Sequence, residues 1–200
     1  MIGLTVLYWN VQRSKIAMAE AIEARREFDI IAVQEPWQNP HVPTTYCPRS
    51  CRYRLIYAGD GSRSALFVHK KHPISSWDAT ATPDWCSVRF TSEGNETTVY
   101  SVYSPIPDRP NQWRSPIHHF LTLDRPQCTL LVGDFNLHHP GWDRHERRSH
   151  GVEDLLELSA HWRLDLHTPK GEPTRSRHDS RDSTIDHAWG TEDLNVTYTW

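Results

Sequence analysis

Apolar and polar residues alternate at both ends of the first 35 residues, with a helical pattern between them. Leu4 to Asn10 reads as a strand, and Ser14 can cap a helix behind it. The apolar residues of that helix recur at helical spacing, at Ile16, Ala19 and Ile22. Phe28 to Gln34 is a second apolar run. This strand–helix–strand order favours an α/β fold.

Short strand patterns fill the middle of the chain, separated by turn residues such as Gly59-Asp60-Gly61. The predicted strands are Tyr53–Ala58, Ala65–His69, Ile74–Trp77, Cys86–Phe90 and Thr97–Tyr103. Ser115 followed by Pro116 is typical of a helix start. An apolar strand then runs from Leu130 to Asp134.

The last quarter predicts one more helix and three late strands. The spacing of Val152, Leu155, Leu156 and Ser159 marks the helix. The strands are Leu164–Leu166, Ser183–Ala188 and Asn195–Tyr198. No repeat or linker divides the chain, so residues 1–200 are interpreted as one domain of antiparallel-rich sheets with helices packed outside.

Composition narrows the class of protein only slightly. A length of 200 residues suits one hydrophobic core, and a net charge of -3 excludes neither nucleic-acid binding nor enzymes. No run reaches the roughly 18 apolar residues of a membrane span, and the N-terminus has no signal-peptide pattern. We expect an intracellular protein of the nucleus or cytoplasm, neither secreted nor membrane-bound. The four cysteines lack zinc-site spacing and are expected to be free thiols.

Polar side chains stand at the ends of several predicted strands. They are Asn10, Glu35, Tyr103, Asp134, Asn136 and Asp186. If these strands share a sheet edge, the side chains form one polar pit with apolar walls. Carboxylates and amides suit a hard cation, Mg²⁺ with Mn²⁺ as the alternative, and a carboxylate base beside a tyrosine suits attack of water on a phosphodiester.

Each of these residues alone also has a simpler interpretation. An Asp or Asn after a strand is common turn chemistry, and a lone tyrosine is common core filling. The pair His138 and His139 fits a solvated rim better than a set of metal ligands. The ordered set, rather than any one member, indicates a catalytic site.

Six arginines lie in the loops flanking the predicted pit, and a basic rim suits a phosphate backbone. They are Arg144, Arg147, Arg148, Arg175, Arg177 and Arg181. The alternative is a solvated loop of mixed charge, since Glu146 and Asp179 lie among them. Trp37 and Trp142 could contact a base or fill the core.

The motifs WN, VQEPW, VYSP, GDFNLHHPGW and STIDHAWG resemble the endonuclease/exonuclease/phosphatase superfamily. Within it the chain is most similar to the endonuclease domains of non-LTR retrotransposons. The runs SHGVEDLLEL and GEPT strengthen the resemblance to that branch. The resemblance covers nearly the whole chain. It implies a four-layer α/β (α+β) fold, two mixed sheets face to face with helices outside, and metal-dependent hydrolysis of a phosphodiester in DNA.

The resemblance also implies roles for individual residues. Glu35 would be the main metal ligand with Asn10 assisting, and Tyr103 would contact the phosphate. Asp134 would orient or deprotonate the attacking water. Asn136 would hold both the phosphate and Asp134 in place. Asp186 would match the acid that supports the family's catalytic histidine. A reverse transcriptase domain in a longer natural chain is an implied partner.

One departure from the family pattern concerns the C-terminal strand with its Ser-Asp-His motif, which this sequence does not contain. The domain is therefore expected to be incomplete at its C-terminus, with impaired activity, because losing one acid–base group typically costs about 10²–10⁴-fold in rate. The alternative is an inactive remnant that keeps the fold and binds nucleic acid. A third possibility is an enzyme of the same superfamily that acts on a different phosphoester substrate.

Overall fold

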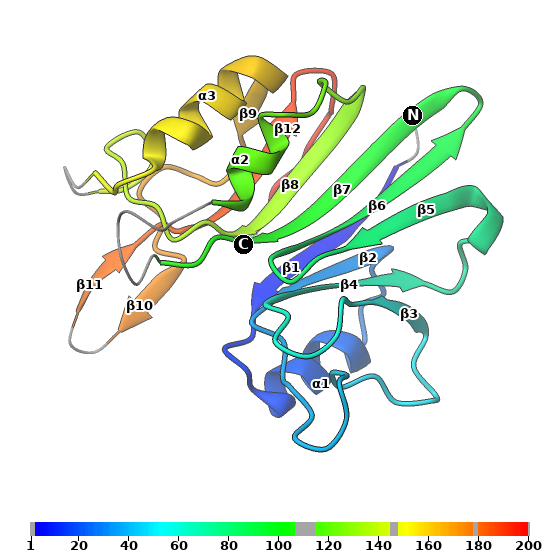
Figure 1. Ribbon diagram of the computed structural model, residues 1–200. Helices are drawn as coiled ribbons and strands as arrows, with labels where there is room; N and C mark the ends of the chain where they lie inside the picture. Colours follow the sequence, from blue (N-terminus) through cyan, green and yellow to red (C-terminus); the bar gives the residue numbers. More distant parts are fainter. Residues whose placement is uncertain (1–2, 107–114, 145–147, 178–179, 200) are drawn as a thin grey trace.

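Two β-sheets lie face to face in the computed structural model, which describes residues 3–106, 115–144, 148–177 and 180–199 (Figure 1). The smaller sheet has the order β1 (Val6–Asn10), β2 (Ile30–Gln34), β4 (Ser64–His69), β3 (Tyr53–Ile56). Its β1 and β2 are parallel, and its other pairs are antiparallel.

The larger sheet is also mixed, with a single parallel pair formed by β7 and β8. Its order is β5 (Trp77–Ala81), β6 (Trp85–Ser92), β7 (Asn95–Tyr103), β8 (Cys128–Asp134), β12 (Asp186–Thr191), β9 (Leu164–Leu166). A separate antiparallel hairpin consists of β10 (Arg175–Arg177) and β11 (Ser180–Ser183).

The helices cover the outer faces of the sheets, which makes four layers (Figure 1). Helix α1 (Lys15–Glu23) packs on the smaller sheet, and α2 (Pro116–Phe120) and α3 (Val152–Trp162) pack on the larger one. The predicted fold class, a DNase-like sandwich, is thus confirmed.

Both predicted N-caps are present, but of the predicted face of α1, Ile16, Ala19 and Ile22, only Ile22 is fully buried. The Ser14 hydroxyl accepts a hydrogen bond from the Ala17 N–H, and Ser115 caps α2 in the same way. The face of α1 that packs on the sheet is Met18, Ala21 and Ile22. Ile16 is 74% exposed, because it lies in the first turn on the opposite side.

Two predicted strands differ in the structure. Residues 74–76 form a short 3₁₀-helix, η1 (Ile74–Ser76), and the strand begins at Trp77 instead. Residues 195–198 form no strand, although Val196 and Tyr198 pack against the inter-sheet core as their apolar pattern suggested.

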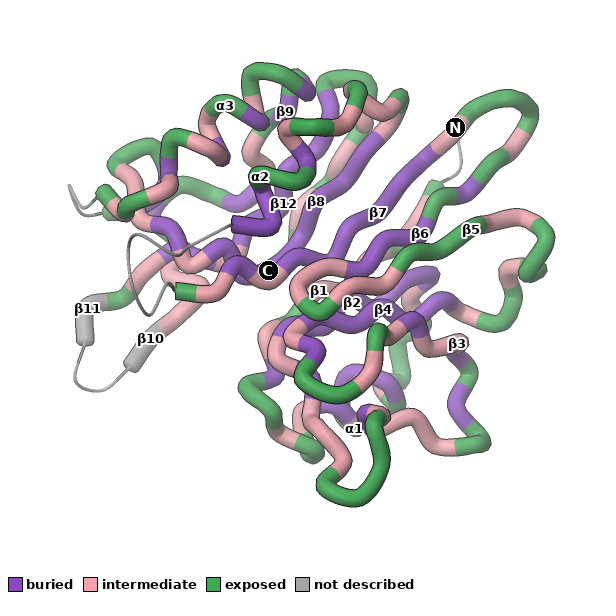
Figure 2. The backbone as a smooth tube through the Cα atoms, viewed as in Figure 1, coloured by how far each residue is buried: buried purple, intermediate pink, exposed green. Residues whose placement is uncertain are grey.

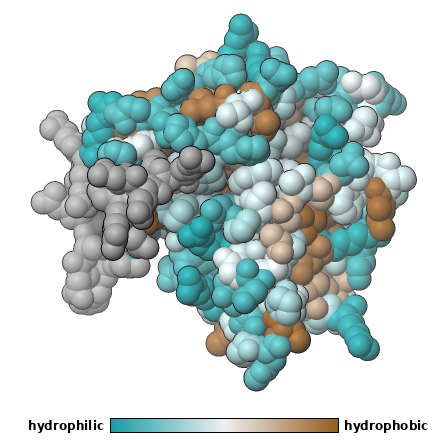
Figure 3. All heavy atoms as spheres, in the orientation of Figure 1, coloured by the Kyte–Doolittle hydropathy of each residue, from teal (hydrophilic) through white to brown (hydrophobic). Residues whose placement is uncertain are grey.

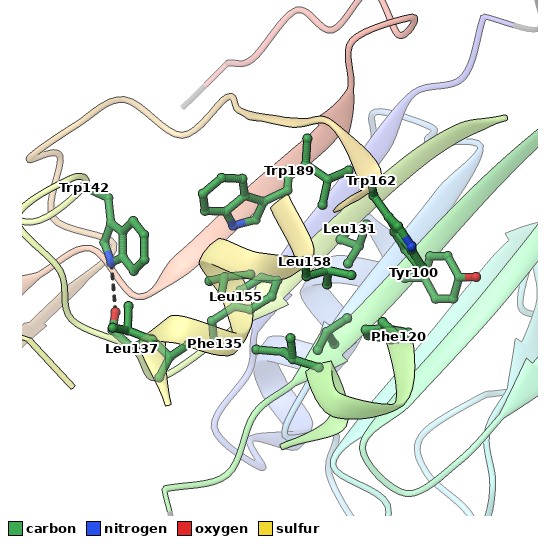
Figure 4. Packing of buried hydrophobic residues seen from close by; sticks show 14 residues of the cluster. Tyr100, Phe120, Leu131, Phe135, Leu137, Trp142, Leu155, Leu158, Trp162 and Trp189 are labelled. Carbon is green, nitrogen blue, oxygen red and sulfur yellow. Dashed lines mark hydrogen bonds between the residues drawn. The ribbon is translucent and has the colours of Figure 1, made fainter. Parts of the chain in front are cut away.

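Hydrophobic side chains form a packed core between each pair of adjacent layers. The inter-sheet core includes Ile30, Leu66, Val88 and Val132, and burial is nearly continuous along β2, β7 and β8 (Figure 2). Aromatic residues dominate the outer core beneath α2 and α3 (Figure 4). Elsewhere, on the face shown in Figure 3, hydrophilic side chains prevail and hydrophobic ones form small patches.

Buried polar side chains also tie the two sheets together. The Gln34 side-chain amide donates to the Ser101 hydroxyl at 2.9 Å, and the Ser64 hydroxyl lies 2.8 Å from the same atom. All three residues are fully buried. A buried hydrogen bond is directional, so this network fixes how the sheets are offset in a way that apolar packing alone would not.

The part of the chain that the structure describes contains no helix long and apolar enough to cross a membrane. All four cysteines are free thiols, as the sequence predicted.

His187 makes the stability of the fold depend on pH. Complete burial among aromatic rings lowers its pKa from 6.5 to about 4. As the pH falls from 6.5 toward 4 the unfolded chain therefore takes up a proton that the folded chain does not. We expect about 3 kcal/mol of unfolding free energy to be lost over this interval.

His187→Phe should keep the ring packing and remove this pH dependence, measured by urea unfolding at several pH values. The control is His161→Gln in the exposed last turn of α3, which should retain it. An unchanged dependence in His187→Phe would contradict the assignment.

Candidate active site

Strand ends from both sheets meet at one edge of the sandwich. Asn10 pairs with Gln34 at the ends of β1 and β2, and Glu35 follows at once. In the larger sheet Asp134 pairs with Tyr103 on one side and with Asp186 on the other. Asp186 opens β12 rather than ending a strand, but β12 is antiparallel to β8, so the carboxylate reaches the same edge.

Asp134 is the most buried carboxylate of the site, with 3% of its surface exposed. The Asn10 side-chain amide donates to one carboxylate oxygen at 2.8 Å, and the backbone N–H of Asn136 donates to the other at 2.9 Å. Asn136 itself donates to the Ser104 carbonyl at 3.0 Å. Both carboxylate oxygens therefore have a fixed donor, which holds the group in one orientation.

Glu35 adopts an unusual backbone conformation, with φ of 47°. The left-handed region costs a non-glycine residue of order 1–2 kcal/mol. Two backbone hydrogen bonds hold Glu35 in this conformation: its N–H donates to the Arg63 carbonyl, and its carbonyl accepts from the Arg13 N–H. The Glu35 carboxylate accepts from the Asn10 amide at 3.3 Å and lies 3.9 Å from the Arg13 guanidinium. One side chain, Asn10, thus connects the carboxylates of the two sheets.

Thr174 positions the third carboxylate. Its hydroxyl accepts hydrogen bonds from the backbone N–H groups of Ile185 and Asp186, at 3.0 and 2.9 Å. The Oδ1 atom of Asp186 is buried and has no hydrogen-bond partner in the structure. A buried carboxylate oxygen without a partner is costly, which points to a missing donor or cation.

Crowding of negative charge changes how these groups ionise. Burial raises the pKa of Asp134, and the neighbouring charge of Asp186 raises it further. Burial likewise raises the pKa of Asp186. For Tyr103, burial and then the charges of Glu35 and Asp134 raise the pKa to about 12, so its hydroxyl stays a proton donor at neutral pH.

The donor set suits a hard cation bound by few protein ligands. Among the described residues no group of three His, Cys, Asp or Glu side chains converges closely enough to hold one ion. Mg²⁺ commonly needs no such cage, because it binds through one or two carboxylates and keeps several waters. The partnerless oxygen of Asp186 and the half-exposed carboxylate of Glu35 therefore fit such an ion. The Asn10 amide turns its N–H atoms toward the acids, since its oxygen accepts from the Gln12 N–H.

A cavity of about 1120 Å³ opens from this edge and continues between the sheets. Asn10, Glu35, Tyr103, Asp134 and Asp186 line its polar end. Asn136 also lines it, so the structure brings all six predicted residues together.

The predicted basic rim is only partly present among the described residues. Arg175 lines the cavity at the base of the β10–β11 hairpin. Arg144 is exposed, and Arg148 pairs with Glu153 at 2.8 Å. Arg177 and Arg181 belong to the same hairpin as Arg175. The prediction for Arg147 lies outside the described residues.

The two histidines after Asn136 contact residues of their own loop, and neither lines the cavity, so their interpretation as rim residues stays a prediction. His138 lies 2.9 Å from a carboxylate oxygen of Asp143, whose other oxygen accepts from the Thr184 N–H at 2.8 Å. His139 packs its ring on Trp142, which is 2% exposed and donates to the Leu137 carbonyl (Figure 4). Trp142 is therefore a core residue.

Gly133 is a site residue that the sequence reasoning missed. Its φ is 148°, and a Cβ at this position would lie 1.9 Å from the Val102 carbonyl oxygen. Thr174 was missed too, although the GEPT run around it had been noticed. For Gly133 the available signal was a glycine directly before Asp134, inside an apolar strand.

Gly133→Ala should destabilise the fold by about 3 kcal/mol or more, because β7 and β8 would have to separate next to Asp134. Gly3→Ala, where an added Cβ meets nothing within 4 Å, is the matched control and should stay within about 0.5 kcal/mol of the parent chain. Chemical denaturation measures both. Equal stability of the two variants would refute the close approach.

Residues 7–200 match the model of the endonuclease/exonuclease/phosphatase family. The chain belongs to this family. Family and fold together support a nuclease or phosphodiesterase function in general.

Solved structures share the fold at low sequence identity. The endonuclease domain of TRAS1, a telomere-specific non-LTR retrotransposon, is 23% identical with a TM-score of 0.69, over 96% of this chain and 86% of that one. The AP endonuclease LMAP from Leishmania major is 13% identical with a TM-score of 0.66, over 96% and 80%. A double mutant of beta toxin from Staphylococcus aureus, solved with bound magnesium ions, is 10% identical with a TM-score of 0.53, over 98% and 86%. No curated protein matches the chain.

Proposed function

We propose that the chain is a divalent-metal-dependent endonuclease that hydrolyses a phosphodiester bond in DNA. The observation that carries the proposal is the convergence of Glu35, Asp134 and Asp186 from two sheets. The Asn10 amide donates to the first two of these carboxylates. Arg13 lies 3.9 Å from Glu35 and Arg175 lines the same cavity, but burial and mutual repulsion still raise the pKa of Asp134, which is typical of a functional cluster of acids. The retrotransposon-like motifs support DNA as the substrate.

Asp134 is the proposed general base. In the reaction it takes a proton from water while the water oxygen attacks phosphorus and the bond to the leaving oxygen breaks. Asn10 and the Asn136 N–H stabilise its ionised form and aim it, which opposes the effect of burial on its pKa. The protonated Tyr103 hydroxyl can donate to a phosphate oxygen as negative charge develops there.

Glu35 is the proposed main ligand of the cation, with Asp186 contributing its partnerless oxygen. When bound, Mg²⁺ or Mn²⁺ would supply positive charge to the phosphate and to the three acids. The side-chain amide of Asn136 lies at the same cavity and is proposed to hold the phosphate. Asn10 is proposed as a positioning residue, and its predicted share in metal binding stays a prediction.

Nicking of supercoiled plasmid tests the activity. We expect nicking with Mg²⁺, none with excess EDTA, and a loss of about 10²-fold or more in Glu35→Gln and Asp134→Asn. Glu20→Gln, an exposed acid on α1, is the control and should nick like the parent. If the parent folds but does not nick, or if all variants nick equally, this assignment fails.

Binding of DNA is tested separately from cleavage, in EDTA. Arg175→Gln should weaken duplex binding at low salt and reduce the slope of log affinity against log salt by about one, because one phosphate contact is lost. Arg89→Gln removes an exposed arginine of β6 that pairs with Asp78 on β5, and it should leave the slope unchanged. Salt-dependent binding without nicking would favour the non-catalytic alternative.

A further inference from the structure

Two of the four cysteines, Cys47 and Cys51, lie in the loop that leads from Glu35 to β3, next to α1 (Figure 1). Three residues separate them along the chain. The Cys51 N–H donates to the Pro48 carbonyl at 2.8 Å, so the backbone turns between the two cysteines. The turn brings their side chains together, and the Cys47 thiol donates a hydrogen bond to the Cys51 sulfur. The loop thus holds two thiols in direct contact.

Anchors on both sides keep the pair in this arrangement. The Tyr46 hydroxyl donates to the Glu23 carboxylate on α1 at 2.8 Å, and Cys47 packs into the same apolar cluster as that helix. On the other side, the Tyr53 N–H at the start of β3 donates to the Cys51 sulfur at 3.4 Å. The two sulfurs therefore need little movement of the backbone to form a bond with each other.

The surroundings make Cys51 the nucleophile of the pair. The hydrogen bond from Cys47 lowers the pKa of the Cys51 thiol, although burial opposes this effect. The Tyr53 N–H and the positive charge of Lys70 lower the pKa of Cys51 further. The same hydrogen bond raises the pKa of the Cys47 thiol, which therefore keeps its proton. Because the thiolate is the form of cysteine that attacks an oxidant, Cys51 reacts first and Cys47 is placed to react second.

Cys86 shows how a cysteine of this chain behaves when it only fills space. It is fully buried on β6, and burial raises the pKa of its thiol to about 12. Such a thiol is inert toward oxidants. Cys51 is 6% exposed, yet its pKa shifts in the opposite direction, so packing alone does not account for it. The same low exposure favours a small oxidant over a bulky disulfide reagent.

We propose that Cys47 and Cys51 are an oxidation site that forms an intrachain disulfide on reaction with a small hydroperoxide. The Cys51 sulfur attacks one peroxide oxygen, so that an S–O bond forms and the O–O bond breaks. The other oxygen leaves and takes up a proton, as an alcohol or, from hydrogen peroxide, as water. Cys51 is then a sulfenic acid.

The second step completes the disulfide. The Cys47 sulfur attacks the sulfur of the sulfenic acid, the S–S bond forms and the S–O bond breaks, and the oxygen leaves as water with the proton of Cys47. Two thiols are thereby oxidised and one peroxide is reduced. The product closes a small ring in the loop that follows Glu35. The proposal is independent of the proposed nuclease activity.

Limited oxidation of the full chain, measured by peptide mass, tests the pair. The reduced protein is treated with one equivalent of hydrogen peroxide at neutral pH, unfolded with N-ethylmaleimide to block the remaining thiols, and digested without reductant. Trypsin cleaves after Arg49, between the two cysteines, so the disulfide should appear as the peptide of residues 27–49 joined to that of residues 50–52. Cys86 and Cys128 should be alkylated. We expect Cys51 to react about tenfold or more faster than Cys128, which is partly exposed on β8.

Two serine variants separate the roles of the thiols. In Cys47→Ser the new hydroxyl can still donate to Cys51, so Cys51 should react but stop at the sulfenic acid, which dimedone traps. In Cys51→Ser, Cys47 should react no faster than Cys128, because its thiol keeps its proton. The parent chain in urea is the control for the sequence alone, and there the preference for Cys51 over Cys128 should disappear.

Any of three results would overturn the proposal. Cys51 and Cys128 could react at the same rate in the folded chain, which would mean that the fold does not activate Cys51. Cys51 of the parent chain could stop at the sulfenic acid, which would mean that Cys47 does not reach it. The disulfide could join two copies of the chain, seen as a dimer on a non-reducing gel. None of these measurements involves DNA, so failure of the nuclease proposal would not change their outcome.

Discussion

Polar hydrogen bonds between the two sheets are the constraint on which the site depends. Apolar packing holds the sheets together but allows them to slide, whereas directional bonds fix their offset. The Gln34–Ser101 bond lies one residue from Glu35, and the Asn10–Asp134 bond joins the strand ends themselves. The carboxylates of one sheet are therefore aimed relative to those of the other by bonds that cross the core.

Much of this arrangement could be predicted from the sequence. Period-two runs located most strands within a few residues, and two serine caps located helix starts. The six polar residues at strand ends were expected to share one pit, and all six line one cavity. An acid after an apolar run is common turn chemistry when taken alone, so the signal came from the ordered set of polar strand ends and not from any one residue.

Tertiary features left no such local signal. The packed face of α1 depends on where the sheet lies, so Met18 was missed and Ile16 was wrongly chosen. Residues 195–198 alternate like a strand but pack as an irregular segment, because an apolar pattern reports burial and not backbone pairing. Arg148 illustrates the same limit, since its salt bridge to Glu153 on α3 cannot be read from its place in a basic loop.

The anchoring of the β10–β11 hairpin has a consequence for how such a protein can evolve. The Thr174 N–H donates to the Ser183 carbonyl, and the Thr174 hydroxyl accepts hydrogen bonds from the N–H groups of Ile185 and Asp186. The foot of the hairpin and the start of β12 are thus one rigid joint. The position of the Asp186 backbone is therefore set at the foot of the hairpin, by the Thr174 hydroxyl. Under the proposed function, selection can alter recognition of the substrate at the hairpin while the position of the Asp186 carboxylate is inherited unchanged.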